Sequence, residues 1–229
     1  MRHALIFAAG LGERMRPLTE HTPKPLLCAG GKPLIVWHLE KLAAAGVNYV
    51  VVNTSHLAEQ FPETLGDGSR WGLRIRYAYE GVRPLETGGG MRNALPLLGD
   101  APFLAISGDV WSDCDYAALP AEPAGLAHLV MVPNPAWHPD GDFVLAADGR
   151  LHEDGPGQRL TFGNIGVYRP EFIRAEPAGR FRLLPCYQRT MRRGLLGGER
   201  HDGRWYNVGT PRQLDELDAA LAAPIDRPA

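Results

Sequence analysis

The sequence predicts an α/β fold, in which one domain is built on a mainly parallel, mixed sheet with helices on both faces. Three observations favour this fold class. The 229 residues suit one large domain, and 45% of them are hydrophobic, enough to bury a core without disulfides or a structural metal. Short apolar runs alternate with helical patterns through the first half of the chain. A glycine-rich loop directly follows the first apolar run, where ligands bind in such sheets.

Four strands and three helices are predicted in the first half. The strands are short apolar or alternating runs, bounded by glycine and polar residues. The first helix opens at Pro33, which suits a first helical turn, and Gly46 is placed to cap its C-terminus. In chain order, the predicted segments are strand 4–9, helix 33–45, strand 49–53, helix 58–65, strand 74–79, helix 91–98 and strand 103–107.

The second half is broken into shorter segments by proline-rich connections. Because no repeat and no linker separates it from the first half, we assign both to one domain. The predicted strands are 126–132, 143–145, 149–151 and 160–168, and the predicted helices are 183–193 and 212–222.

Charge and cysteine content exclude several classes of function. The formal net charge is −2, from 24 basic and 26 acidic residues, so neither nucleic acid nor a membrane surface is an expected partner. The three cysteines are widely spaced and form no metal-binding pattern, which is typical of buried thiols in a reducing compartment. No apolar stretch approaches the roughly 18 residues of a membrane helix. We therefore expect a cytoplasmic protein.

The loop at 10–17 has the features of a phosphate-binding site. Gly10 and Gly12 allow the backbone to approach an anion and to point N–H groups at it, and Arg14 adds a positive charge. Met15 stands where the dinucleotide-binding fingerprint needs its third glycine, and no G-K-[ST] follows. The loop is therefore neither that fingerprint nor a Walker P-loop.

Five segments along the chain together resemble the motifs of the sugar-1-phosphate nucleotidyltransferases. They follow in the order of that family: F-A-A-G-L-G-E-R-M-R-P-L-T at 7–19 with T-P-K-P-L at 22–26, P-L-E-T-G-G at 84–89, S-G-D-V at 107–110, G-N-I-G-V-Y at 163–168 and W-Y-N-V-G-T-P at 205–211. The resemblance spans residues 3 to about 220. It implies a Rossmann-like fold of the glycosyltransferase-A type, with one nucleotidyltransferase domain over 1–229. The nucleotide-binding half is expected at about 1–115 and the sugar-binding half at about 116–222.

Members of this family join a sugar 1-phosphate to a nucleoside triphosphate and release pyrophosphate, with Mg²⁺ as the cofactor. Catalysis is then largely positioning and charge neutralisation, because both partners are anionic. The matched motifs imply that Arg14 holds the β- and γ-phosphates, that Lys24 contacts an α-phosphate oxygen, and that Asp109 is the first ligand of Mg²⁺. These three residues form the predicted catalytic set.

Further site residues are implied by the same resemblance. The nucleotide-binding candidates are Ala9, Gly10, Leu11, Gly12, Glu13, Arg14, Lys24, Glu80, Thr87 and Gly88. The sugar-binding candidates are Asp109, Gly141, Glu153, Asn164 and Arg159, and the metal ligands are Asp109 and Asn207.

Two departures from the family pattern bear on the site. Asn207 stands where the family usually has an aspartate, so we expect the metal to bind more weakly. Many members carry a lysine after the glutamate that corresponds to Glu153, whereas here Asp154 follows it and the second half has no lysine at all. We therefore expect an arginine, Arg150 or Arg159, to anchor the sugar phosphate.

The motifs leave the exact substrates open. The chain length and the loops at 66–72 and 85–90 most resemble the members that transfer UMP from UTP to N-acetylmuramate α-1-phosphate in peptidoglycan recycling. Mannose-1-phosphate guanylyltransferase and glucose-1-phosphate thymidylyl- or uridylyltransferase activities are the alternatives. A catalytically weak regulatory subunit that binds nucleotide sugars is the alternative of another class. The intact Arg14, Lys24 and Asp109 argue against it, whereas Asn207 favours it weakly.

Overall fold

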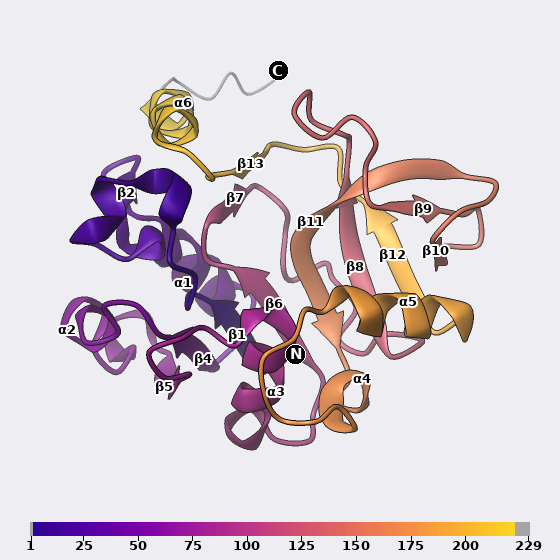
Figure 1. The fold of residues 1–229 in the computed structure, drawn as a ribbon, viewed down its shortest axis with the longest axis horizontal. Helices are drawn as coiled ribbons and strands as arrows, with labels where there is room; N and C mark the ends of the chain where they lie inside the picture. The colour runs from indigo at the N-terminus through magenta and orange to yellow at the C-terminus, as the bar shows by residue number, and fades with distance from the viewer. Residues whose placement is uncertain (1, 223–229) are drawn as a thin grey trace.

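The computed structural model describes residues 2–222 and joins nine of their strands in one sheet (Figure 1). The strands are β1 (His3–Phe7), β4 (Tyr49–Thr54), β5 (Arg74–Tyr79), β6 (Phe103–Ser107), β8 (Ala127–Val132), β9 (Phe143–Leu145), β10 (Leu151–His152), β11 (Gln158–Tyr168) and β12 (Leu196–Arg200). From one edge the order is β5, β4, β1, β6, β11, β8 and β12, and two short strands, β9 and β10, extend the sheet beside the first residues of β11. Two small sheets pair β2 (Cys28–Ala29) with β3 (Lys32–Pro33), and β7 (Val110–Ser112) with β13 (Trp205–Asn207).

Parallel pairing dominates the first half of the large sheet. β1 is parallel to both β4 and β6, and β4 is parallel to β5. β11 runs antiparallel to β6 and to β8, so the sheet is mixed. This arrangement, with helices on both faces, confirms the predicted fold class.

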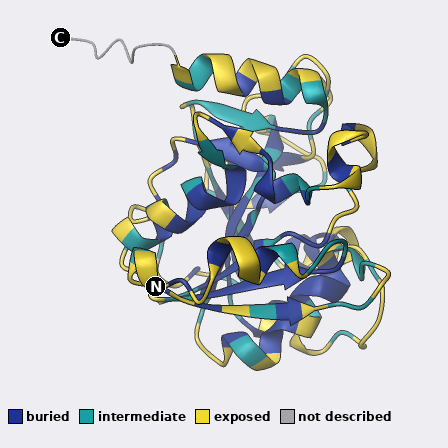
Figure 2. Ribbon diagram, turned by 90° about the vertical axis from the view of Figure 1, so that its left-hand side faces the viewer, coloured by how far each residue is buried: buried dark blue, intermediate teal, exposed yellow. Residues whose placement is uncertain are grey.

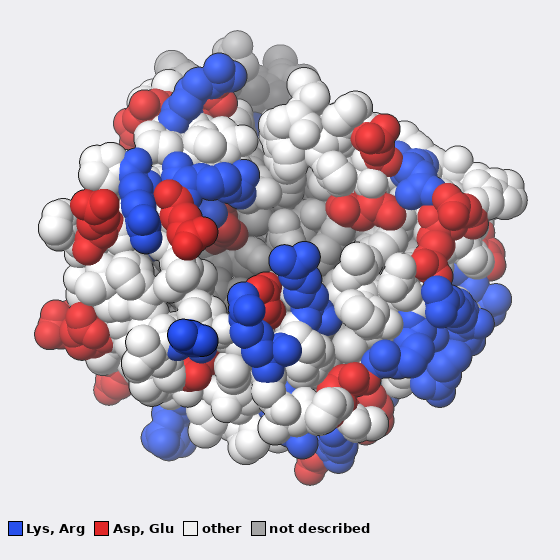
Figure 3. All heavy atoms as spheres, viewed as in Figure 1, with Lys and Arg blue, Asp and Glu red and all other residues white. Residues whose placement is uncertain are grey.

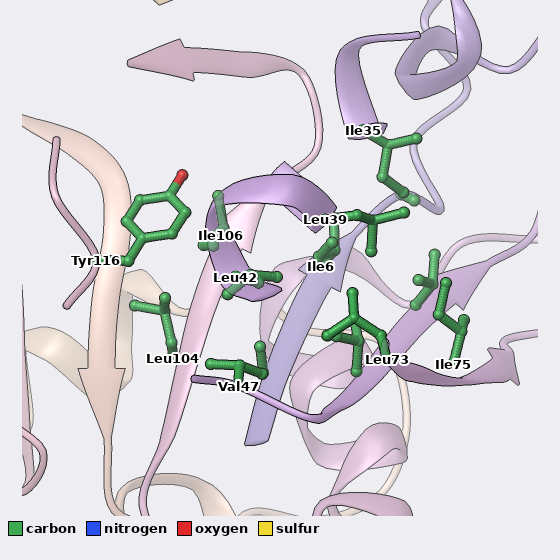
Figure 4. Packing of buried hydrophobic residues seen from close by; sticks show 14 of the residues in the cluster. Ile6, Ile35, Leu39, Leu42, Val47, Leu73, Ile75, Leu104, Ile106 and Tyr116 are labelled. Carbon is green, nitrogen blue, oxygen red and sulfur yellow. The ribbon is translucent and has the colours of Figure 1, made fainter. Parts of the chain in front are cut away.

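Successive residues of β1 point to opposite faces of the sheet and join different hydrophobic clusters. Ile6 belongs to the cluster that contains Leu39 and Leu42 of helix α1 (Leu34–Ala44), which Figure 4 shows from close by. Leu5 belongs to the cluster that contains Met91 of helix α3 (Glu86–Leu98). Each aliphatic side chain of this kind contributes roughly 1.5–3 kcal/mol when it is fully buried. In Figure 2 the central strands are accordingly mostly buried, and the outer surfaces of the helices are exposed. The helices are α1 (Leu34–Ala44), α2 (Gln60–Leu65), α3 (Glu86–Leu98), α4 (Glu171–Arg174), α5 (Leu184–Arg192) and α6 (Pro211–Ala222).

The last helix returns to the beginning of the chain. α6 lies beside the hairpin of β2 and β3 (Figure 1). Leu214 and Leu217 of α6 share a third hydrophobic cluster with Met15 and Leu34. β13, which precedes α6, pairs with β7, which follows β6. These contacts bring the last sequence motif next to the first and third motifs.

The start of α3 differs from the prediction. The sequence pattern predicts a helix from residue 91, but α3 begins at Glu86 and includes a run of three glycines. Glycine disfavours a helix by roughly 1 kcal/mol relative to alanine, so propensity argues against this start. Tertiary packing overrides it: a Cβ on Gly88 would lie 2.5 Å from the ring of Phe181, and a Cβ on Gly89 would meet the carbonyl of Gly179. The glycines are required because another segment crosses this turn at close range.

Other differences concern short or glycine-containing elements. The strands β7, β12 and β13 and the helix α4 are not among the predicted elements. β12 has the sequence L-G-G-E-R, which carries no apolar alternation, and it is held by its parallel pairing with β8. β1 ends two residues earlier than predicted, because the N–H of Ala8 donates to the side-chain oxygen of Asn53 at 2.6 Å. Within residues 2–222, no helix is both long and apolar enough to cross a membrane.

Candidate active site

A cleft of about 610 Å³ opens at the carboxyl ends of β1, β4 and β6. Figure 3 shows this hollow in the middle of one face of the molecule, with Lys and Arg side chains on both sides of it. Its lining includes most of the predicted nucleotide-binding residues, from separate parts of the sequence. They are Ala9, Gly10, Leu11, Gly12, Glu13, Arg14, Lys24, Glu80 and Thr87. Gly88, the remaining candidate, is buried in the first turn of α3.

The glycine-rich loop is held in one conformation by its neighbours. Gly12 has a left-handed backbone (φ 64°), and its carbonyl accepts a hydrogen bond from the Thr19 hydroxyl at 2.8 Å. A Cβ at this position would lie 2.7 Å from the Thr19 methyl group, so only glycine fits. Met15 is fully buried and is the last residue of the short 3₁₀ helix Glu13–Met15. Arg14 therefore projects from a fixed turn, and its guanidinium lies against Gly209 of the last motif.

Asn53 and Glu80 connect this loop to the next strands. The Asn53 side chain accepts from the N–H of Ala8 and donates to a Glu80 carboxylate oxygen, both at 2.6 Å. The other Glu80 oxygen accepts from the N–H of Leu85 at 2.7 Å. Burial raises the pKa of the Glu80 carboxyl group, although both hydrogen bonds oppose that shift. Glu80 thus fixes the loop that leads to α3, in addition to lining the cleft.

The segment 179–183, which precedes α5, closes one side of the cleft. The Phe181 carbonyl accepts from the N–H groups of Gly88 and Gly89 at 2.9 and 3.0 Å, and the N–H of Leu183 donates to the Thr87 hydroxyl at 3.2 Å. These bonds dock a segment of the second half of the chain onto the 84–89 motif. The docked segment brings the Arg180 side chain into the cleft lining.

Arg180 is held there by an acidic partner. Its guanidinium lies 2.5 Å from a carboxylate oxygen of Glu86, and Arg182 lies 3.7 Å from the other oxygen. Glu86 has a left-handed backbone (φ 62°), which a residue with a Cβ rarely adopts. Backbone strain of this kind is concentrated at functional sites.

Lys24 and Asp109 form an ion pair inside the cleft. Lys24 lies in the short helix 24–26, and its side chain is only 12% exposed. Asp109 follows β6 after a tight turn, in which the N–H of Gly108 donates to the Phe7 carbonyl at 2.9 Å. A Cβ on Gly108 would lie only 3.0 Å from that carbonyl, so the turn needs glycine.

Asp109 and Asn207 lie on neighbouring chain segments. Asn207 of β13 is opposite Val110 of β7, and the N–H of Val208 donates to the Asp109 carbonyl at 2.9 Å. The described residues contain no cluster of three His, Cys, Asp or Glu side chains that could hold a metal ion. Mg²⁺ does not need such a cluster, because it keeps several waters and shares phosphate oxygens with a substrate. The Asp109 carboxylate, open to the cleft, has the chemistry of a ligand for this ion.

A second cavity of about 350 Å³ lies beside β11. Asn164 and Asn207 both line it. Asn164 has a left-handed backbone (φ 58°) and sits in a bulge of β11, between Phe162 and Gly166, where the pairing with β8 shifts. The complete lining is Trp137, His138, Asp142, Phe143, Thr161, Phe162, Asn164, Leu184, Tyr187, Trp205 and Asn207.

The other sugar-binding candidates are placed differently. Asp109 lines the larger cleft, whereas Gly141, Glu153 and Arg159 are in the lining of neither cavity. The Glu153 carboxylate accepts from Gln188 and Arg192, at 2.8 and 3.0 Å. The guanidinium of Arg159 donates to the carbonyls of Asp142 and Glu153 and pairs with the Asp154 carboxylate. Arg150 is largely exposed and pairs with Asp148.

The family model of the nucleotidyl transferases matches residues 3–133, more than half of the chain. The chain belongs to the nucleotidyl transferase family.

Two curated relatives resemble the chain over almost its whole length. N-acetylmuramate alpha-1-phosphate uridylyltransferase of Neisseria meningitidis serogroup B is 46% identical over 96% of this chain and 98% of its own. The enzyme of the same name from Caulobacter vibrioides is 36% identical, over 96% of each chain. A solved structure from Bacillus anthracis, described as a glucose-1-phosphate thymidylyltransferase in complex with sucrose, superposes with a TM-score of 0.84 over 99% of this chain and 98% of its own, at 19% identity. The family and the fold that the sequence motifs imply are therefore confirmed.

Two residues that line the larger cleft, Asn53 and Arg180, lie outside the sequence motifs and were not predicted. Asn53 is the polar end of an otherwise apolar strand, and this position at the carboxyl end of a parallel strand is a usable signal. Arg180 lies in a loop with no motif, and only its docking onto the 84–89 motif brings it to the cleft.

Proposed function

We propose that this nucleotidyl transferase transfers UMP from UTP to N-acetylmuramate α-1-phosphate and releases pyrophosphate. The observation that carries the proposal is that Arg14 and Lys24 of the first motif and Asp109 of the third face one cleft at the carboxyl ends of the parallel strands. The names of the two near-full-length relatives favour these substrates over the other sugars and bases. We assign the reaction to peptidoglycan recycling in the cytoplasm. The three cysteines are free thiols, as in a reducing compartment, but Cys28 is exposed and not buried as predicted.

The proposed chemistry is an in-line displacement. An oxygen of the sugar phosphate attacks the α-phosphorus of UTP, and the bond from that phosphorus to the pyrophosphate oxygen breaks. Arg14 holds the β- and γ-phosphates, since its guanidinium can bind two oxygens at once. Lys24 moves from Asp109 to an α-phosphate oxygen, where it stabilises the charge of the transition state.

Mg²⁺ is the proposed cofactor. The Asp109 carboxylate and the Asn207 amide oxygen would hold it, both being the oxygen ligands that this ion prefers. When bound, the ion neutralises charge on the triphosphate. Asn207 contributes no negative charge, so the proposed site holds the ion less tightly than a pair of carboxylates.

Arg180 is the best-supported anchor for the sugar phosphate. Arg150 and Arg159 were expected in this role, but neither is in the lining of either cavity. Arg180 lines the larger cleft, and four residues later Leu184 lines the second cavity. A cation at this position can reach a phosphate that bridges the two cavities, once Arg180 releases Glu86 and binds the phosphate instead.

The second cavity suits the sugar. Trp137 and Trp205 are stacked with ring centroids 6.3 Å apart, and apolar aromatic surface of this kind packs against the C–H face of a sugar ring. Asn164 and Thr161 add groups that can hydrogen-bond to hydroxyl or N-acetyl groups.

The test is pyrophosphate release with four nucleoside triphosphates against N-acetylmuramate, N-acetylglucosamine, glucose and mannose 1-phosphates. We expect the highest kcat/KM with UTP and N-acetylmuramate α-1-phosphate. Preference for GTP with mannose 1-phosphate would identify a guanylyltransferase instead. No release with any pair, together with binding of the nucleotide sugar, would identify a regulatory subunit.

A further inference from the structure

The second cavity contains one pair of ionisable side chains that could recognise an acid. Among the described residues that line it, none is Lys or Arg, and the ionisable ones are His138, Asp142 and Tyr187. The Tyr187 hydroxyl is already bonded to the Tyr168 hydroxyl at 2.7 Å. His138 is therefore the lining side chain that can carry positive charge.

Asp142 is fixed so that it can orient this imidazole. One of its carboxylate oxygens accepts from the N–H of Phe162 at 2.8 Å. The other lies 3.1 Å from Nε2 of His138. With Nε2 bonded to a carboxylate, the second ring nitrogen, Nδ1, is left for a ligand.

The loop that carries the pair is anchored to the sheet. The Asn134 amide donates to the Pro139 carbonyl at 2.9 Å and accepts from the Thr161 hydroxyl of β11 at 2.9 Å. Gly141 has a left-handed backbone (φ 60°), and a Cβ there would lie 2.6 Å from the Asn134 oxygen. The His138 ring also stacks on Trp137, which stacks on Trp205. The imidazole is thus held at the cavity by a built loop.

We propose that His138, oriented by Asp142, binds the lactyl carboxylate of the acceptor and makes the enzyme selective for an acidic sugar. The proposal rests on the function proposed above, in which the acceptor is N-acetylmuramate α-1-phosphate. That acceptor carries two anionic groups, its phosphate and its carboxylate. Arg180, in the other cavity, is placed for the first, and the His138 ring is placed for the second. An acceptor without the carboxylate does not use His138.

The test compares acceptors that differ in the carboxylate. We would measure KM and kcat of the wild type, His138→Gln and Asp142→Asn with N-acetylmuramate and N-acetylglucosamine 1-phosphates and with UTP. Titration calorimetry would give the affinity of any acceptor that is not turned over. The matched control is His128→Gln, which breaks the pair of His128 with Glu199 (3.0 Å) between β8 and β12, outside both cavity linings.

We expect His138→Gln to raise KM for N-acetylmuramate 1-phosphate by about tenfold or more, as for the loss of one charge-assisted hydrogen bond. KM for UTP and the affinity for N-acetylglucosamine 1-phosphate should change by less than about twofold. Asp142→Asn should give a smaller effect with the same selectivity, and His128→Gln none. An equal loss of affinity for both acceptors would show that His138 has a merely structural role and would overturn the proposal. Unchanged affinity for both acceptors would also overturn it, and would assign recognition of the carboxylate to the neutral amide side chains of the cavity. A wild type that is active only with sugars lacking a carboxylate would refute the proposed function itself, and this proposal with it.

Discussion

At the scale of single residues, the Lys24–Asp109 ion pair is the feature on which the proposed chemistry depends. Both side chains are mostly shielded from water, with 12% and 29% exposed. We expect Lys24→Ala and Asp109→Ala each to lower kcat by about a hundredfold or more, because each removes a charge directed at the transition state. Circular dichroism should show native folding. Lys32→Ala is the control, because Lys32 pairs with Glu40 outside the cleft. A loss of less than about tenfold in a folded variant would contradict the assigned roles.

Asn207 allows a separate test of the metal site. A carboxylate in place of the amide adds one negative charge beside a divalent cation, so Asn207→Asp should tighten Mg²⁺ binding. The measurements are the dissociation constant for Mg²⁺ from titration calorimetry and the Mg²⁺ concentration that gives the half-maximal rate. Both should fall. If neither changes, residue 207 lies outside the first coordination shell.

The candidate site residues that sequence motifs predicted are those whose chemistry is local. The loop that contains Gly12 and Arg14 has its own turn geometry, so its function is visible in a few consecutive residues. Arg180 could not be found in this way, because it depends on hydrogen bonds between segments about 90 residues apart. Arg159 shows the opposite case. Its position near a sugar-binding motif suggested a ligand role, but in the fold its donors are directed at Asp142, Glu153 and Asp154.

At the scale of elements, the start of α3 is fixed by contact with the segment 179–183. Gly88→Ala would place a Cβ 2.5 Å from the Phe181 ring, which cannot be accommodated without movement of one segment. We expect a loss of about 1–3 kcal/mol in the free energy of unfolding and a higher KM for UTP, because the adjoining Thr87 and Glu86 line the cleft.

The double variant tests that explanation. Phe181→Ala removes the ring, so Gly88→Ala should cost less stability in that background than in the wild type. Chemical denaturation of the four proteins measures the coupling. Gly197→Ala is the control, because its Cβ would be no closer than 3.4 Å to any neighbour. If the stability losses of the two single variants simply add in the double variant, the Phe181 ring is not the reason that residue 88 is a glycine.

The elements predicted from sequence are those with strong periodicity. The buried strands β1, β4 and β6 and the amphipathic helix α1 carry apolar patterns that specify them locally. The strands β12 and β13 carry none, because β12 contains two glycines and β13 is only partly buried. Pairing with β8 and β7 determines them, and that information lies elsewhere in the chain.

At the scale of the whole molecule, the two predicted halves share one sheet. β11 of the second half pairs with β6 of the first, and α6 packs on the hairpin near the N-terminus. The segment 179–183 adds a third connection, at the cleft itself. The proposed nucleotide and sugar subsites are thus parts of one continuous sheet structure, with a relative position that the core maintains.

Acid stability should depend on His38, which lies where α1 meets Tyr116. The ring is fully buried, with Nδ1 2.8 Å from the Tyr116 hydroxyl, and burial, followed by the charge of Lys41, lowers the pKa of His38 to about 4. The unfolded chain has a His pKa near 6.5, so between pH 6.5 and 4 the unfolded state binds more protons and the folded state loses stability as the pH falls. From pH 7 to pH 5 this group alone should remove about 2 kcal/mol from the free energy of unfolding. Urea denaturation of the wild type and His38→Gln at both pH values measures it. The variant should be less stable at pH 7 but lose about 2 kcal/mol less on acidification, and identical pH dependence in the two proteins would show that His38 is not the group responsible.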